Sequence, residues 1–249
     1  MKGKQTEAPI VVENLHKAFG EQHVLNGLNL RVDQGSTTAV LGRSGTGKSV
    51  LLKLLIGLQP PDEGSICVHG EDITRLEPRK LNEVRKRVGF LFQQAALYDS
   101  MTVAENVEFP LNRHSDLSHE DRKKKARELL HAVGMDKDVD KMPSEISGGM
   151  QKRVGLARAL ALDPDILLFD EPTAGLDPIT ATEIGKLISN LKREHKVTAV
   201  VVTHDLPAAR LFSDRFVLIH DGELVLEGDY EELRRSRNEL AVQFLRNGG

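Results

Sequence analysis

The residues best suited to chemistry in this sequence form a glycine-rich run that ends in a lysine and a serine. The run follows the apolar segment Thr37–Leu41, and its spacing is G-x-x-x-x-G-K-S. Glycines allow consecutive backbone N–H groups to point at phosphate oxygens, and the N-terminus of a following helix adds positive charge there. Lys48 would reach the β- and γ-phosphates of a nucleotide, and the Ser49 hydroxyl would bind Mg²⁺. We therefore predict that MgATP binds to Gly42, Arg43, Ser44, Gly45, Thr46, Gly47, Lys48, Ser49 and Val50.

Two adjacent carboxylates end another apolar segment. Ile166–Phe169 is expected to be a buried strand, and Asp170 and Glu171 follow it directly. A parallel strand beside the strand at Thr37–Leu41 would place Asp170 next to the Mg²⁺. Glu171 would then lie where an attacking water has to be polarised, as a general base. The alternative for this pair taken alone is two solvated loop residues, and the phosphate-binding run favours the catalytic interpretation.

A second helix start has the chemistry of an anion site. Ser147, Gly148 and Gly149 precede a helix that we expect from about Gly149. Unpaired N–H groups in a first helical turn, together with a serine hydroxyl, can bind phosphate. The sequence thus contains two helix starts that could bind phosphate.

The segment Ile146–Arg153 resembles the signature motif of the ABC ATPases, which is usually written LSGGQ. Ile146 replaces the leucine, and Met150 replaces the glutamine. The resemblance extends from about Ile10 to Gly228, with the motifs in the order of the family. It implies a head-to-tail dimer that sandwiches ATP between the phosphate-binding run of one chain and four signature residues of the other, which here are Ser147, Gly148, Gly149 and Met150.

Four further residues match that family one by one. The resemblance implies that Phe19 stacks on adenine and that Gln93 contacts Mg²⁺ and the attacking water. It also implies that Asp177 belongs to a loop that touches the partner subunit, and that His204 senses the γ-phosphate. The expected catalytic residues are therefore Glu171, His204 and Gln93. The expected metal ligands are Ser49, Gln93 and Asp170.

Some of these residues have other interpretations. The alternative for Phe19 is a place in the core, and Gln94 is an alternative to Gln93, although the family register favours Gln93. The basic run Arg122–Lys125 could indicate nucleic-acid binding. On a helix with a buried opposite face, such a run is instead a solvated surface.

Strands that alternate with helices predict an α/β fold with a mainly parallel sheet. We expect a P-loop NTPase core, an N-terminal antiparallel β subdomain and a helical signature subdomain at about 95–160. These would form a single nucleotide-binding domain over 1–249, with a C-terminal tail at about 229–249. Thr102–Glu105 and Ser118–Asp121 are predicted to be capping boxes that begin helices.

Composition limits the compartment and the partners. The chain has 34 Lys and Arg against 37 Asp and Glu, a balance that gives no support for coating nucleic acid or an anionic membrane. Cys67 is the only cysteine, so a reducing compartment is the simplest interpretation. No signal peptide is expected, and no apolar run approaches the ~20 residues of a membrane span. If the protein serves a membrane, another chain is expected to supply the membrane part.

Three details indicate a subgroup of ABC transporter ATPases. Met150, the segment Asp177–Thr180 and a tail that includes Gln243–Gly248 resemble the ATPases of bacterial Mla/Mce-type lipid-trafficking systems. The resemblance implies phospholipid traffic across the cell envelope and a place at the cytoplasmic face of the inner membrane, bound to a permease. Expected partners are a second copy of the chain, integral-membrane permease subunits and a lipid-binding Mce-type protein, with no nucleic acid. The alternatives are the ATPase of an importer for amino acids or other small solutes, and a soluble ABC ATPase that acts on nucleic acid.

Overall fold

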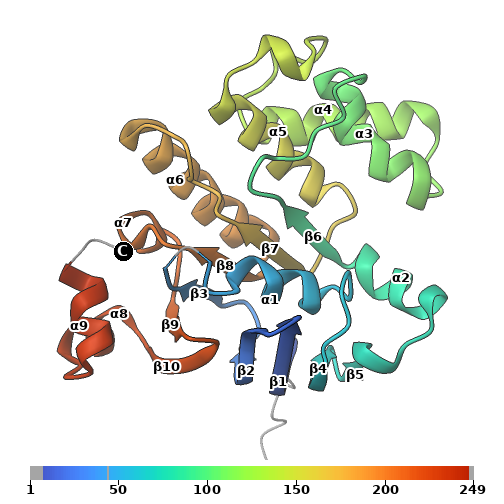
Figure 1. The fold of residues 1–249 in the computed structure, drawn as a ribbon. Coiled ribbons are helices and arrows are strands. Elements are labelled where there is room, and N and C mark those ends of the chain that lie inside the picture. Colours follow the sequence, from blue (N-terminus) through green and yellow to red (C-terminus); the bar gives the residue numbers. More distant parts are fainter. Residues whose placement is uncertain (1–7, 44, 247–249) are drawn as a thin grey trace, which may run out of the picture.

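The computed structural model describes residues 8–43 and 45–246. Its strands form two sheets, one of four strands and one of six (Figure 1). Helix α1 and the smaller sheet cover one face of the larger sheet, and other helices cover the opposite face. None of the helices in the described ranges is both long enough and apolar enough to cross a membrane.

The four-stranded sheet is antiparallel, as the sequence predicted, and has the order β2-β1-β4-β5. Its strands are β1 (Ile10–Phe19), β2 (Gln22–Val32), β4 (Glu63–Val68) and β5 (Glu71–Asp72). β1 continues beyond a bulge at Asn14, which adopts a left-handed conformation (φ 47°) where the register with β2 shifts. Such a bulge breaks the alternation of apolar and polar residues by which a strand is predicted.

The six-stranded sheet has the order β10-β9-β3-β8-β7-β6 and is parallel except for β10. Its strands are β3 (Thr37–Leu41), β6 (Val88–Leu91), β7 (Ile166–Asp170), β8 (Thr198–Thr203), β9 (Arg215–His220) and β10 (Glu223–Gly228). The prediction that the Asp170 strand pairs directly with β3 is wrong, because β8 lies between β3 and β7. The carboxyl ends of the three strands still meet at one edge, with Leu41 opposite Thr203 and Asp170 opposite Val202.

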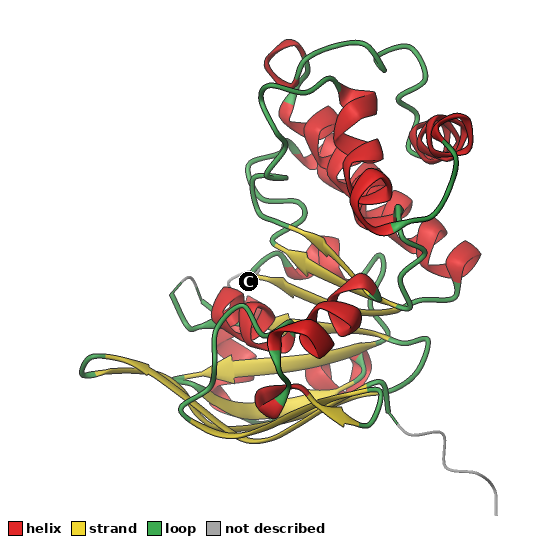
Figure 2. Ribbon diagram, turned by 90° about the vertical axis from the view of Figure 1, so that its right-hand side faces the viewer, coloured by secondary structure: helices red, strands yellow, loops and turns green. Residues whose placement is uncertain are grey.

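The described residues also form nine α-helices and two 3₁₀ turns. The helices are α1 (Lys48–Leu55), α2 (Pro78–Lys86), α3 (Val103–His114), α4 (His119–Ala132), α5 (Gly148–Leu160), α6 (Pro178–His195), α7 (Leu206–Ala209), α8 (Tyr230–Arg235) and α9 (Glu239–Arg246). The 3₁₀ turns are η1 (Ile73–Arg75) and η2 (Pro143–Glu145). Helices α3 and α4 lie away from the sheets with the start of α5, which runs back toward the β6 edge (Figures 1 and 2).

The starts of α3 and α4 follow from their first residues. Thr102 forms the predicted capping box: its hydroxyl accepts from the Glu105 N–H at 3.2 Å, and the Glu105 carboxylate accepts from the Thr102 N–H at 2.8 Å. At α4 only half of the predicted box forms. The Ser118 hydroxyl accepts from the Asp121 N–H at 3.2 Å, but the Asp121 carboxylate accepts from the Ser118 hydroxyl rather than from its N–H. In the basic run that follows, Lys123 and Lys124 are exposed, whereas Arg122 and Lys125 are partly buried and Lys125 pairs with Asp163.

The core divides into two apolar clusters, one on each face of the larger sheet. Successive residues of a central strand contribute to opposite faces: Ala39 and Leu41 belong to one cluster and Val40 to the other. The same alternation holds along β7 and β8, as expected for strands covered on both sides. The central strands are therefore fixed from both faces, and the loops that follow them extend from a rigid edge.

Candidate active site

The glycine-rich run connects β3 to α1, between a buried strand and a helix start as the sequence predicted. Gly45 and Gly47 have φ of 83° and 87°, a conformation that other residues adopt only with strain. A Cβ on Gly47 would also lie 2.4 Å from Val24 Cγ1 and 2.8 Å from the Val24 carbonyl oxygen. Gly47 is therefore required both for its conformation and for its close approach to β2. Ser44, a predicted contact, lies outside the described residues.

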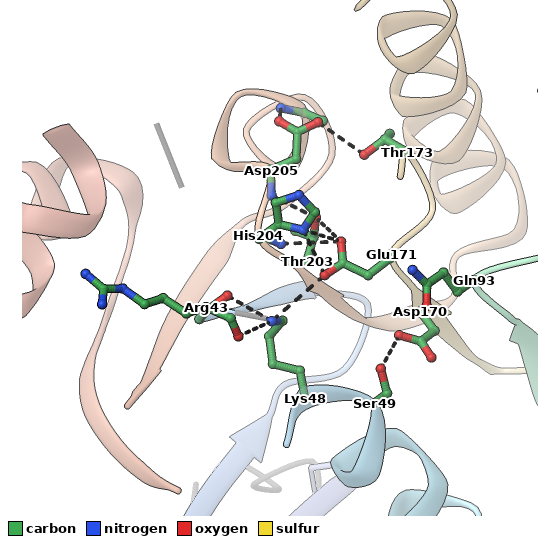
Figure 3. A network of polar contacts seen from close by, with 12 residues as sticks. Arg43, Lys48, Ser49, Gln93, Asp170, Glu171, Thr173, Thr203, His204 and Asp205 are labelled. Atoms are coloured by element: carbon green, nitrogen blue, oxygen red, sulfur yellow. Dashed lines mark hydrogen bonds and ion pairs between the residues drawn. The ribbon is translucent and has the colours of Figure 1, made fainter. Parts of the chain in front are cut away.

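Lys48 begins α1 and its ammonium group points back into the loop (Figure 3). Nζ donates to the carbonyl oxygens of Gly42 at 2.8 Å and Arg43 at 2.9 Å, and lies 3.9 Å from Glu171 Oε1. The side chain is 5% exposed, and burial lowers its pKa, against the opposing effects of Glu171 and Asp170. A buried cation held by backbone carbonyls at a helix start is well placed to take a phosphate oxygen as a further partner.

The side chain of Asp170, the last residue of β7, contacts the first turn of α1. Its Oδ1 accepts a 2.7 Å hydrogen bond from the Ser49 hydroxyl, although β8 separates the two parent strands. Burial raises the pKa of Asp170, and the hydrogen bond from Ser49 opposes that rise. The exposed Gln93, just beyond β6, lines the same cleft, and Gln94 does not. Hydroxyl, carboxylate and amide oxygens are ligands that Mg²⁺ accepts, so these residues fit the ion.

Glu171 sits at a bend, with φ of 46°, where the chain leaves β7. Its Oε2 accepts hydrogen bonds from the Thr203 hydroxyl at 3.0 Å and from the backbone N–H of His204 at 3.4 Å. The imidazole Nδ1 of His204 lies 3.0 Å from the same oxygen. The carboxylate is thus held from the end of β8, and it faces the Lys48 ammonium (Figure 3). Both carboxylates are buried, which excludes the alternative of two solvated loop residues.

These side chains surround a single cleft of about 380 Å³. Its lining consists of Phe19, Val24, Gly45, Gly47, Lys48, Ser49, Val50, Gln93 and Glu171. Phe19 is 48% exposed at the mouth, so the alternative of a core position for this ring is wrong. The cleft combines an apolar ring, a cation at a helix start and the Glu171 carboxylate, and Asp170 is hydrogen-bonded to Ser49 in its wall. These groups suit a magnesium-bound nucleotide.

Comparison with known proteins decides the family. Residues 25–174 match the family of ABC transporter proteins. The chain belongs to the ABC transporter family. It is an ATP-hydrolysing ATPase subunit of a transporter, as its motifs predicted.

Relatives of this ABC ATPase belong to transport systems for different substrates. The intermembrane phospholipid transport system ATP-binding protein MlaF of Haemophilus influenzae is 42% identical over 95% of this chain and 90% of its own. The probable ribonucleotide transport ATP-binding protein mkl of Mycobacterium leprae is 41% identical over 95% of this chain and 68% of its own. Among solved structures, the dimeric ATP-binding cassette MJ0796 bound to ADP and Pi is 36% identical, with a TM-score of 0.81 over 88% of this chain and 98% of its own.

The signature residues of this ABC ATPase lie apart from the cleft. Ser147 caps α5, and its side chain accepts from the Met150 N–H at 3.3 Å. A Cβ on Gly149 would lie 2.6 Å from Thr180 Cγ2, so this position has no room for a larger residue. None of Ser147, Gly148, Gly149 and Met150 is among the described residues that line the cleft.

Asp177 caps α6, its Oδ1 accepting from the backbone N–H groups of Ile179 and Thr180 at 3.0 and 3.1 Å. Its other carboxylate oxygen accepts from the Thr180 hydroxyl, and this bond lowers the pKa of Asp177. Asp177 therefore stabilises its own helix. Neighbouring Ile179 is an apolar side chain left 75% exposed beside it.

Two residues of the site were not predicted from the sequence. Thr203 holds the Glu171 carboxylate, and its position directly before His204 at a strand end was a usable signal. Lys152 donates to the backbone carbonyl oxygens of Gln93 and Glu171. Burial lowers the pKa of Lys152 to about 8, and Asp170 and Glu171 oppose the shift. No local pattern marks Lys152, because its partners are backbone atoms far away in the sequence.

Proposed function

We propose that two copies of this ATPase form a head-to-tail dimer whose ATP hydrolysis drives a permease that moves phospholipid in the bacterial cell envelope. The observation that carries the ATP chemistry is the Lys48–Glu171–His204 arrangement above the Ser49–Asp170 hydrogen bond. In the proposed reaction, Lys48 and the glycine-rich loop bind the phosphates of ATP. Ser49, Asp170 and Gln93 hold Mg²⁺, which neutralises charge on the phosphates when bound.

Glu171 is the proposed general base for the attacking water. Its carboxylate is oriented by three donors from the end of β8, so it reaches the water without reorganising. His204 lies between this carboxylate and solvent, with a side chain 47% exposed, where it can contact the γ-phosphate. Phe19 would stack on the adenine at the mouth of the cleft.

The dimer is proposed because one chain leaves each site incomplete. The signature residues at the start of α5 do not line the cleft of their own chain in the part that the structure describes. The related cassette MJ0796 is dimeric with ADP and Pi bound. We therefore assign Ser147, Gly148, Gly149 and Met150 to the nucleotide of the partner chain, and the loop of Asp177 to the contact between chains.

Mixing two inactive variants should test this assignment. Lys48→Ala disables the phosphate loop, and Ser147→Arg blocks the signature, so each purified variant should hydrolyse ATP far more slowly than the unmodified chain. A mixed dimer has one intact composite site, and the mixture should recover part of the lost activity. Recovery is measured as phosphate release after subunit exchange.

The matched control for this mixture is Lys48→Ala with the double variant that carries both changes, since no mixed dimer then has an intact site. That pair should recover no activity. If the first mixture also recovers nothing although mixed dimers form, the signature does not act on the nucleotide of the partner chain.

A groove beside Gln93 is the proposed docking site for a permease helix. Its volume is about 400 Å³, and it is lined mainly by apolar groups of the β6 region, α3 and α5, including Phe90, Phe92, Tyr98 and Phe109. Tyr98 packs against Phe109 with 4.6 Å between ring centroids and the rings tilted by 46°, and it remains 44% exposed. A partly exposed aromatic pair is typical of an interface hot spot.

The loop that carries Tyr98 is held rigidly. The buried amide of Asn106, on α3, accepts from the Tyr98 N–H at 2.8 Å and donates to the carbonyl oxygens of Tyr98, Met101 and Thr102 at 3.0–3.1 Å. These four hydrogen bonds satisfy the amide and fix the loop next to Gln93. A permease helix in this groove would move with the segment that carries a proposed Mg²⁺ ligand.

Tyr98→Glu should separate ATP chemistry from transport. A carboxylate in this apolar groove would have to be desolvated on docking, so the variant should bind ATP normally but fail to co-purify with its permease. Leu58→Glu, which places a carboxylate at an exposed position outside the groove, is the control for both ATP binding and permease retention. An intact complex from Tyr98→Glu would reject the docking site.

The same complex tests the substrate. In reconstituted vesicles, the unmodified complex should transfer labelled phospholipid in an ATP-dependent manner, and Tyr98→Glu should not. The lipid assignment rests on the resemblance of the signature, the Asp177–Thr180 segment and the tail to lipid-trafficking ATPases, and on the relative MlaF. Transport of a ribonucleotide, an amino acid or another polar solute alone would reject it in favour of an importer of small solutes.

A further inference from the structure

Lys152 lies near the start of α5, and its charged end is buried directly beneath the active site. The residue is 4% exposed. Its ammonium group donates to the backbone carbonyl oxygen of Gln93 and, at 3.2 Å, to that of Glu171. One side chain thus contacts the backbone of the proposed general base and of a proposed Mg²⁺ ligand.

A buried ammonium is a costly way to fill space, since burial removes its hydration. An apolar side chain of similar length could pack at this position without that cost. What the ammonium adds is a set of donors for two carbonyl groups that belong to separate loops, one after β6 and one after β7. Its charge is also placed close to Asp170 and Glu171, which favour the protonated form.

The backbone of Glu171, which Lys152 contacts, has an unfavourable conformation. Its left-handed φ of 46° is unfavourable for a residue other than glycine and persists only where neighbouring groups hold it. Its N–H donates to the Val202 carbonyl oxygen at 2.9 Å, and its carbonyl oxygen accepts from Lys152 and from the Ala174 N–H, both at 3.2 Å. The peptide that aims the Glu171 side chain is therefore fixed from β8 and from α5.

We propose that Lys152 is a positioning residue of the ATPase site, which holds the backbones of Gln93 and Glu171 at a set distance from α5 and from each other. It acts through those two residues and does not contact the nucleotide. The proposal rests on the roles assigned above to Gln93 and Glu171.

The position of Lys152 on α5 extends its role to the dimer. α5 begins at the Ser147 cap, and the Gln151 N–H donates to the Ser147 carbonyl oxygen at 2.9 Å, so Lys152 is in continuous helix with the signature. Nucleotide of the partner chain, bound at Ser147, would fix α5, and Lys152 would pass that position to Gln93 and Glu171 of its own chain. Each site would thereby sense whether the other is closed.

Three substitutions separate this role from simple packing. Lys152→Met keeps the length of the side chain and removes every donor, Lys152→Gln keeps a neutral donor, and Lys152→Arg keeps both donors and charge. Lys124→Met, at an exposed position of α4, is the control for loss of a lysine. The rate constant kcat, the KM for ATP and the melting temperature are measured for the full-length chain.

We expect Lys152→Met to lower kcat by about 10- to 100-fold, because small displacements of positioned catalytic groups have effects of that order. KM for ATP should stay within about threefold, since the phosphate loop is untouched, and Lys152→Arg should restore most of kcat. The kcat of Lys152→Gln should lie between those of the Met and Arg variants. If Lys152→Met does not fold, the comparison of the Gln and Arg variants provides the test. Hydrogen exchange of 93–96 and 171–173 should quicken in Lys152→Met, with α1 unchanged.

Unchanged kcat in Lys152→Met would overturn the proposal. So would equal losses in the Met, Gln and Arg variants together with weaker ATP binding and a lower melting temperature, which is the result of a purely structural role. Glu171→Gln, measured in parallel, identifies the failing assumption. If Glu171→Gln remains active, the assignment of the base is wrong; if it is inactive while Lys152→Met is normal, only the role of Lys152 is rejected.

Discussion

Glu171→Gln should lower kcat for ATP hydrolysis by at least about 100-fold while leaving ATP affinity within a few-fold of normal, since removal of a general base has an effect of 10²–10⁴. An amide of the same shape can keep the hydrogen bond from the Thr203 hydroxyl at 3.0 Å, so the local structure should persist. It cannot accept the proton of the attacking water. Ser49 and Asp170 are unchanged and should still hold Mg²⁺.

The same variant should accumulate as a dimer when ATP is added, because the closed state can form but cannot hydrolyse its nucleotide. Light scattering measures the dimer, and single-turnover phosphate release measures the chemical step. Glu183→Gln is the matched control: it removes an exposed carboxylate that pairs with Arg153 at 2.9 Å and should leave kcat unchanged. Normal hydrolysis by Glu171→Gln would show that another group, or water alone, removes the proton.

Lys48→Ala should weaken MgATP binding by about 100-fold or more, because hydrogen bonds to a charged donor contribute about 1.5–3 kcal/mol each and this ammonium can make two or more to the phosphates. The fold should survive the change. Lys48 is buried against backbone carbonyls, and its removal takes away a charge that was costly to bury. Calorimetric titration measures the affinity, and the melting temperature checks the fold.

Lys80→Ala, at an exposed position of α2, is the control for loss of a lysine. It should bind MgATP with unchanged affinity. Should Lys48→Ala bind MgATP as tightly as the unmodified chain, the glycine-rich loop would not be the phosphate site, and the assignments of Ser49 and Asp170 would fall with it.

The sequence was most informative where structure depends on neighbours along the chain. The glycine-rich run lies between a buried strand and a helix, as predicted, because a phosphate loop is built from consecutive backbone N–H groups and glycines that permit φ of 83° and 87°. The capping box at Thr102 formed for the same reason. The signature was recognisable because a helix start and its cap are also encoded within a few residues.

The sequence alone did not predict features that depend on residues far apart along the chain. Continuous apolar runs predict that β3, β7 and β8 are buried, but every strand buried on both faces has such a run, so the pattern does not say which strands are neighbours. The expected β3–β7 pair was therefore wrong, although Asp170 still reaches Ser49. Helix α2 was missed because it buries little besides Val84.

By itself, then, the sequence determined the family, the α/β class with a mainly parallel sheet and the local shape of the phosphate loop, because each is encoded by residue types at short spacing. Only the tertiary structure decided that Glu171 is aimed by Thr203 and His204, and that Lys152 joins the backbones of Gln93 and Glu171. The physical reason is that these partners are brought together by the packing of strands and helices. Backbone carbonyl groups are the same in every residue, so a contact with them leaves no mark in the sequence.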